Sequence, residues 1–145
     1  MNTDAHLDST ESQRRLPAIL IVDDSAVTLR GLCSLFLSGG YQPASFQEGL
    51  TAITFAREHK PAGAVIDIHL PDISGLLVSK ELREILGPDA PIVVLSGDAS
   101  MEVLNSLPRV GATYFFQKPV NGSLLLQHFF DQLHDVYPLL QKPVM

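Results

Sequence analysis

The sequence has one cysteine, no tryptophan and no apolar stretch as long as a membrane-spanning helix. A single cysteine, Cys33, excludes an internal disulfide or a cysteine-rich metal site, and we interpret it as an inert helix residue. A bilayer-spanning helix needs about 20 apolar residues. The polar residues 1–15 also lack the apolar core of a secretory signal. These absences predict a cytoplasmic protein without a membrane partner.

Basic charge is scarce as well, with 10 Lys and Arg against 16 Asp and Glu. Proteins that bind nucleic acid normally present a basic face, so direct nucleic-acid binding is disfavoured. Hydrophobic residues make up 46% of the chain, which places it among globular proteins. Its 145 residues suit one domain with a full core. We predict a flexible leader at residues 1–16, a domain at 17–138 and a short tail at 139–145.

Strand-like and helix-like segments alternate five times after the leader. All but the second strand are continuous apolar runs, typical of a parallel sheet covered on both faces. The expected strands are 18–23, 41–46, 64–68, 91–96 and 113–117. The expected helices are 25–38, 50 to before Pro61, 73–86, 100–107 and 121 to before Pro138, with the fourth short or distorted at Pro108. This alternation predicts a doubly wound α/β fold, in which ligands bind beyond the carboxyl ends of the strands.

Apolar spacing predicts which side of each helix faces the core. The expected inward stripes are Val27, Leu32, Leu35 and Phe36 in the first helix, Leu77, Leu82 and Ile85 in the third, and Leu125, Phe129, Leu133 and Val136 in the fifth. A second stripe in the first helix has two interpretations, namely partial burial against the fifth helix or a docking face for a partner. It consists of Leu29, Cys33 and Leu37.

Acidic residues end two of the predicted strands. Asp23 and Asp24 follow the first strand, and Asp67 follows the third. Crowded carboxylates repel one another unless a cation compensates, so the three predict a divalent ion bound through oxygen. Ser96 and Lys118 end the fourth and fifth strands and reach the same sheet edge. Helix capping, the usual explanation of a lone Asp at a strand end, does not explain why all five gather.

Other polar residues next to these strands have simpler interpretations. Asp24 or Ser25 can cap the first helix, and Asn121 can cap the fifth. Asp72 is expected to cap the helix that begins at Ile73, rather than to bind an ion. The histidines at positions 6, 59, 128 and 134 are interpreted as solvated surface residues.

With these motifs the chain resembles the receiver domains of two-component response regulators, from about residue 18 to 136. The motifs that carry the resemblance are Asp23-Asp24, the segment Asp67 to Gly75, Leu95-Ser96-Gly97 and Lys118-Pro119. Their order and spacing make the set specific, although each is weak alone. The resemblance implies a flavodoxin-like (βα)5 fold with a five-stranded parallel sheet in the order 2-1-3-4-5.

The resemblance also implies roles for single residues. Asp67 would be the phosphoacceptor, taking a phosphoryl group from a phosphohistidine on a histidine kinase or a histidine phosphotransfer protein. Asp23, Asp24, Asp67 and the backbone carbonyl of His69 would hold Mg²⁺, which suits carboxylates and phosphoryl oxygens.

Three further residues would respond to the phosphoryl group. Lys118 would pair with Asp67 at rest and with a phosphoryl oxygen afterwards, and the Ser96 hydroxyl would bond a second oxygen. Phe115, at a position where receivers often have tyrosine, would follow Ser96 inward as the switch residue. The Lys118-Pro119 peptide is expected to be cis, as in the family.

The implied function is a phosphorylation-dependent signalling switch that catalyses only its own phosphorylation and dephosphorylation. It would change contacts with a downstream protein target or output domain, with a possible homodimer through helix 4, strand 5 and helix 5. The chain would be a single-domain regulator, or a receiver from a larger regulator or a hybrid kinase that takes part in a phosphorelay.

Three alternatives compete with this function. A haloacid dehalogenase-type hydrolase needs Asp where His69 stands, and a flavin module needs a phosphate loop where Asp23 and Asp24 stand. The intact acidic set argues against an unphosphorylated interaction module.

Overall fold

The computed structural model describes residues 16–98 and 100–144. The predicted leader, apart from Leu16, and Met145 lie outside the described residues, so the division into leader, domain and tail stays a prediction. Within the described tail, Leu140 is buried and packs with the core beneath the last helix. No described helix is both long and apolar enough to cross a membrane.

A five-stranded, all-parallel sheet forms the centre of the molecule. Its strands are β1 (Ala18–Val22), β2 (Gln42–Phe46), β3 (Gly63–Asp67), β4 (Ile92–Ser96) and β5 (Tyr114–Gln117). Their spatial order is β2-β1-β3-β4-β5, which confirms the predicted fold class and strand order. Each strand end lies within one residue of the prediction. Pro43 lies in β2 at the sheet edge, where a residue without an N–H is tolerated.

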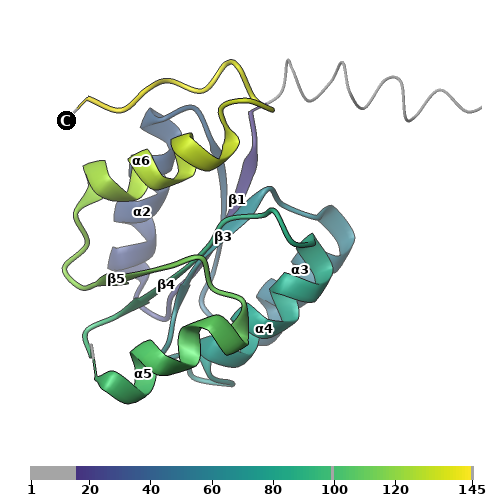
Figure 1. Cartoon of the computed structure of the whole chain (residues 1–145), viewed down its shortest axis with the longest axis vertical. Helices are drawn as coiled ribbons and strands as arrows, with labels where there is room; N and C mark the ends of the chain where they lie inside the picture. The colour runs from purple at the N-terminus through teal and green to yellow at the C-terminus, as the bar shows by residue number, and fades with distance from the viewer. Residues whose placement is uncertain (1–15, 99, 145) are drawn as a thin grey trace, which may run out of the picture.

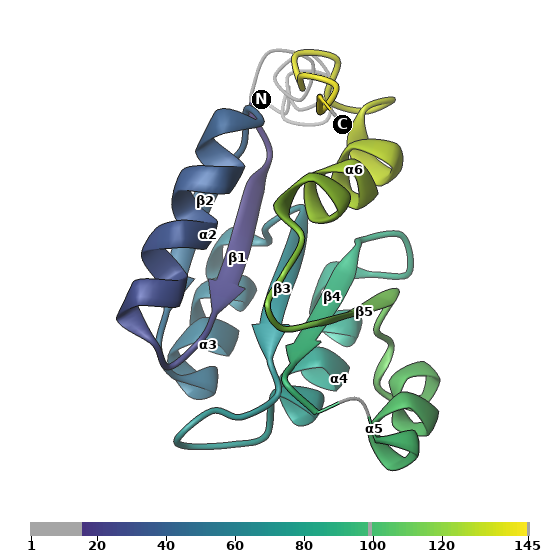
Figure 2. The same cartoon turned by 90° about the vertical axis from the view of Figure 1, so that its left-hand side faces the viewer.

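Helices cover both faces of this sheet (Figure 1). On one face, α2 (Ala26–Ser38) and α6 (Gly122–Leu133) pack over a cluster centred on Ile21, Phe36 and Phe129. On the other face, α3 (Gly49–His59) and α4 (Gly75–Leu86) pack over a second cluster that includes Leu20 and Ile66. The short α5 (Met101–Ser106) and the 3₁₀ turn η1 (Leu107–Val110) follow β4. The strands all point to the same end of the molecule, away from the C-terminal tail (Figure 2).

The helix ends follow the capping residues in the sequence. Ser25 caps α2 and Asn121 caps α6, as expected. The α-helix after β4 gives way to η1 just before Pro108, which confirms the predicted short helix. Asp72 does not cap α4, because Ser74 accepts the N–H of Leu76 there. The loop after β3 carries Asp72 away from α4, and its carboxylate bonds the first residues of α3 instead.

The inward faces of three helices differ from the prediction. Val27 is 70% exposed and Leu77 is 46% exposed, and Val136, 54% exposed, lies beyond the end of α6, so none of them faces the core. In α2 the buried residues are Leu29, Leu32 and Phe36, which come from both predicted stripes. Both apolar stripes of α2 satisfy helical spacing, and the position of the sheet decides which residues of each are covered. The second stripe is therefore buried at Leu29, partly buried at Cys33 and exposed at Leu37.

Candidate functional site

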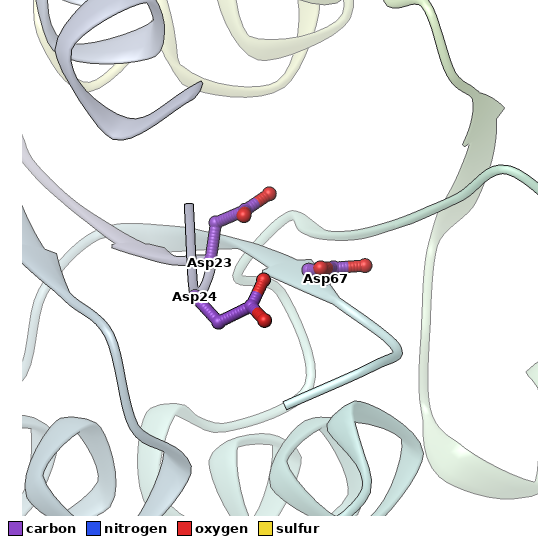
Figure 3. A group of neighbouring side chains, drawn as sticks. All are labelled: Asp23, Asp24 and Asp67. Carbon is purple, nitrogen blue, oxygen red and sulfur yellow. The ribbon is translucent and has the colours of Figure 1, made fainter. Parts of the chain in front are cut away.

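The fold brings three carboxylates together at the carboxyl ends of β1 and β3. Asp23 and Asp24 follow β1, Asp67 ends β3, and one oxygen of each lies within 4.8 Å of the others. Figure 3 shows the three side chains pointing toward a shared space. Asp23 and Asp67 are buried, and Asp24 is exposed. The cluster therefore has a buried floor and one side open to solvent.

The turn into α2 fixes the Asp23 carboxylate. Its Oδ1 accepts the N–H of Ser25 at 2.9 Å, and its Oδ2 accepts from Lys118 Nζ at 2.8 Å. The Ser25 hydroxyl meanwhile accepts the N–H of Thr28 at 3.2 Å as the helix cap. Asp23 thus points inward with both oxygens engaged, while Asp24 faces solvent.

Asp67 is surrounded by groups that change its pKa in opposite directions. Burial, followed by the charge of Asp23, raises the pKa of the Asp67 carboxyl. Lys118, at 3.4 Å from Oδ2, and the N–H of His69, at 3.3 Å from Oδ1, lower this pKa without cancelling the rise. A further cation at this place would stabilise the carboxylate form.

Lys118 joins the end of β5 to the carboxylates. Its Nζ contacts both acids but lies closer to Asp23 than to Asp67, at 2.8 Å against 3.4 Å. Burial lowers the pKa of Lys118, but the hydrogen bond that it donates to Asp23 and the charge of Asp67 outweigh burial and raise the pKa. The ammonium therefore stays charged, and it compensates Asp23 as well as Asp67. The peptide between Lys118 and Pro119 is cis, as predicted.

Ser96 and Phe115 lie on β4 and β5, the two strands that follow β3 in the sheet. Ser96 is fully buried, directly after the β4 residue that pairs with Asp67. Its Oγ accepts the N–H of Asp98 at 2.9 Å, which leaves the hydroxyl proton available to another acceptor. Phe115 is half-buried and stands beside Val94 in register. The side chain of His69 is exposed, two residues beyond Asp67.

Three residues to which the sequence assigned no role at the site also shape it. Gln47 donates from Nε2 to the carbonyl of Asp24 at 3.0 Å. Gly75 lies so close to the strand end that a Cβ there would collide with the carbonyl oxygen of Asp67. Asp72 bonds α3 rather than the helix that follows it. Only the glycine has a local signal, since a glycine at a helix start indicates close approach of backbone.

The donor set fits a hard divalent cation. All three clustered side chains offer carboxylate oxygen, and neither sulfur nor imidazole contributes to the cluster. Oxygen donors suit Mg²⁺ and Ca²⁺, whereas zinc sites in proteins are usually built from Cys and His. The exposed Asp24 leaves room for water or a phosphoryl oxygen on the solvent side.

Comparisons with known proteins agree with this geometry. The family model of the response regulator receiver domain matches residues 19–130. The photosynthetic apparatus regulatory protein RegA of Rhodovulum sulfidophilum is 37% identical over 107 residues, which cover 74% of this chain and 58% of RegA. The polar-differentiation response regulator DivK of Brucella anthropi is 29% identical over 124 residues, covering 81% of this chain and 97% of DivK.

A solved structure shares the fold as well. A response regulator protein from Burkholderia pseudomallei, described with a phosphorylated aspartic acid, calcium ion and citrate, superposes with a TM-score of 0.73. It is 28% identical, and the match covers 81% of this chain and 68% of that one. The sheet order, the acidic cluster at the strand ends and these similarities lead to one conclusion: the chain belongs to the receiver domain family of response regulators.

Proposed function

We propose that this chain is a phosphorylation-dependent signalling switch in which Asp67 is the phosphoacceptor. Receiver domains are signalling regulators rather than conventional enzymes. The observation that carries the proposal is the buried Asp67 carboxylate at the end of β3, with two acids and one lysine around it. This arrangement supplies a carboxylate nucleophile and a lysine ammonium that can contact an anionic phosphoryl group. The two further acids would hold a cation that compensates the remaining negative charge.

The proposed reaction is one phosphoryl transfer. A carboxylate oxygen of Asp67 attacks the phosphorus of a phosphohistidine on a histidine kinase or a phosphotransfer protein. A P–O bond forms while the P–N bond breaks, and its electron pair returns to the imidazole nitrogen. Lys118 Nζ, already 3.4 Å from Asp67, then contacts one phosphoryl oxygen, and the Ser96 hydroxyl donates to another. Attack by water on the phosphorus later returns the carboxylate and releases phosphate.

Asp23, Asp24, Asp67 and the carbonyl of His69 are the residues that would hold Mg²⁺. When bound, the ion supplies positive charge that screens an anionic nucleophile from an anionic phosphoryl group. The chain's own residues keep Asp23 and Asp67 buried and pointing to one place, so little reorganisation is needed for binding.

The switch would run from Ser96 through Phe115 to the surface formed by α5, β5 and α6. Phosphorylation replaces the single charge of the Asp67 carboxylate by the roughly two negative charges of a phosphoryl group, and such a change can shift an element that has two arrangements. Tyr114 on β5 and Leu124 on α6 are exposed, so this surface has an apolar patch to offer a downstream target, an output domain or a second copy. The chain spans 58% of RegA and 97% of DivK, so both a receiver within a larger regulator and a single-domain regulator have precedents.

Chemical phosphorylation tests the proposal. Acetyl phosphate with Mg²⁺ should add one phosphoryl group to the wild type, and intact-mass spectrometry should find none on Asp67→Asn. Asp135→Asn, which changes a highly exposed carboxylate, is the matched control and should be labelled like the wild type. Equal labelling of Asp67→Asn and wild type would contradict the assignment.

The role of Lys118 has a separate test. Lys118→Ala should still be phosphorylated to some extent, because Asp67 remains. It should, however, transmit the resulting conformational change to Phe115 poorly. NMR of the backbone amide of Phe115 before and after beryllofluoride addition measures that transmission. A full wild-type shift in Lys118→Ala would contradict the role proposed for the lysine.

A further inference from the structure

The segment at residues 47–50, which runs from the end of β2 into the first turn of α3, contains none of the proposed metal ligands, yet it contacts both loops that do. Gln47 donates from Nε2 to the backbone carbonyl of Asp24 at 3.0 Å. On its other side, the N–H groups of Gly49 and Leu50 donate to Asp72 at 2.9 and 2.8 Å. Residues 47–50 therefore form a bridge between the turn after β1 and the loop after β3.

The Asp72 end of the bridge acts on the loop that carries His69. That loop swings out toward α3 before it enters α4 (Figure 2). At its base, the N–H of Gly75 donates to the carbonyl of Ile68 at 2.8 Å. The two bonds of Asp72 hold the far side of the same loop. With both places fixed, the backbone around His69 has little freedom to turn.

The start of α3 provides a strong attachment for this carboxylate. Glu48 stands at the N-cap of α3 but makes no side-chain cap bond, and the first turn contains no acidic residue. The free N–H groups and the positive end of the helix dipole therefore attract a carboxylate from elsewhere. Asp72 fills this place with one oxygen on each N–H. The hydrogen bond from Leu50 keeps the pKa of Asp72 below its usual range, so the bonds favour the charged carboxylate.

The Gln47 end of the bridge acts on the other proposed ligand loop. Asp24 is the one exposed acid of the cluster, so burial does not fix its position. The bond from Gln47 holds the backbone of Asp24 instead. Asp24, Gln47, Glu48 and Pro71 line one groove beside the site.

We propose that Gln47 and Asp72 are positioning residues that set the affinity of the site for its divalent cation. Through the segment at residues 47–50, they hold Asp24 and His69 at a fixed separation before the ion arrives. This rests on the proposed function, because it takes Asp24 and the His69 carbonyl as ligands. Groups that orient metal ligands typically change metal affinity by 10–100-fold when they are removed.

Titration calorimetry of the metal-stripped full chain with MgCl₂ alone tests the proposal. Asp72→Ala should weaken Mg²⁺ binding about tenfold, near the lower end of that range. Asp72→Asn should weaken binding less, because one amide oxygen can still accept an N–H. Gln47→Ala should weaken it severalfold, and as an exposed residue it should fold normally. Since both bonds act through one loop, the double variant should lose less affinity than the product of the two single losses.

Arg83→Met is the matched control. Arg83 also bonds a backbone carbonyl of another segment, that of Gly111 before β5, and the carbonyl of Gly87 at the end of its own helix, but at the opposite end of the sheet from Asp67. Urea unfolding should show a loss of stability in Arg83→Met with wild-type Mg²⁺ affinity, whereas Asp72→Ala should change both.

The outcomes separate this inference from the proposed function. If Asp24→Asn loses Mg²⁺ binding while Gln47→Ala and Asp72→Ala bind within twofold of the wild type, the positioning role is wrong and the site assignment stands. If the wild type itself takes up no Mg²⁺, the proposed function fails and this inference fails with it.

Discussion

The Nζ of Lys118 lies 2.8 Å from Oδ2 of Asp23, and these two residues stand 95 positions apart in the sequence. The lysine joins the end of β5 to the end of β1 across the two strands between them. Asp23 is fully buried, and its second oxygen is held by a backbone N–H. In the metal-free chain Lys118 therefore compensates a buried charge that has no access to solvent.

Removing the lysine should destabilise the metal-free protein. Lys118→Met leaves Asp23 buried without its cation, and breaking a buried pair in this way costs about 3 kcal/mol. Urea unfolding in EDTA should show this loss, and MgCl₂ should restore more stability to the variant than to the wild type. Lys80→Met, which changes an exposed lysine of α4, should show neither effect. Equal stability of wild type and Lys118→Met in EDTA would contradict the prediction.

The glycine at the start of α4 should tolerate no side chain. In Gly75→Ala the new Cβ would collide with the carbonyl oxygen of Asp67 and lie 2.7 Å from the Cα of Ile68. The backbone after β3 must then shift, which should lower the free energy of unfolding by about 1–3 kcal/mol. Phosphorylation by acetyl phosphate should fall as well, because the shift moves Asp67 itself.

Gly31→Ala is the control for this variant. Gly31 lies within α2, and a Cβ there would meet nothing within 4 Å. Replacing a helical glycine by alanine stabilises by roughly 0.5–1 kcal/mol, so this variant should unfold at higher urea concentration than the wild type. Similar losses in Gly75→Ala and Gly31→Ala would show that close packing at Asp67 is not the cause.

His128 should make stability depend on pH. It is half-buried on α6 against Tyr114 and Phe129, and its Nε2 lies 3.3 Å from Thr113 Oγ1. The sequence predicted a solvated surface position for His128, whereas the structure partly buries this side chain. Burial lowers the pKa of His128, and the nearby charge of Asp131 opposes this without cancelling it.

The sign of the pH effect follows from that direction. Below about pH 6.5 the unfolded chain binds more protons at this histidine than the folded chain, so stability falls as the pH falls toward the lowered folded-state pKa. His128→Gln keeps an N–H donor for Thr113 and should lose less stability between pH 7.5 and 5.5 in urea titrations. His59→Gln, at an exposed position of α3, should retain the wild-type slope. If the free energy of unfolding fell equally with pH in wild type and His128→Gln, the prediction would be contradicted.

Replacing Tyr41 by phenylalanine should stabilise the folded protein. Its ring is buried edge-on against Phe36 and Phe129, and its hydroxyl has no hydrogen-bond partner among the described residues. Burial, with a smaller contribution from the charge of Asp131, raises the pKa of this hydroxyl. An unsatisfied buried hydroxyl costs about 1–3 kcal/mol, so Tyr41→Phe should raise the free energy of unfolding by about 1 kcal/mol. A loss of stability would show that the hydroxyl is bonded in solution.

The site could be predicted from the sequence where it follows strand ends. Asp23, Asp24, Asp67, Ser96 and Lys118 each end a short apolar run, and parallel strands bring such ends to one edge. The same pattern did not reveal Gln47 or the true partner of Asp72. Their bonds reach 23 residues along the chain to another loop, and no local spacing encodes the path of a loop.

The sequence by itself determined the five β-α units, the parallel sheet and the cluster of acids, because hydrophobic period and strand-end polarity are local properties. Tertiary structure alone decided which residues of α2 are buried, that Lys118 lies closer to Asp23 than to Asp67, and that α3 takes its cap from another loop. Each of these depends on where a distant segment lies once the helices have packed on the sheet, since a side chain pairs with the nearest partner in space rather than in sequence.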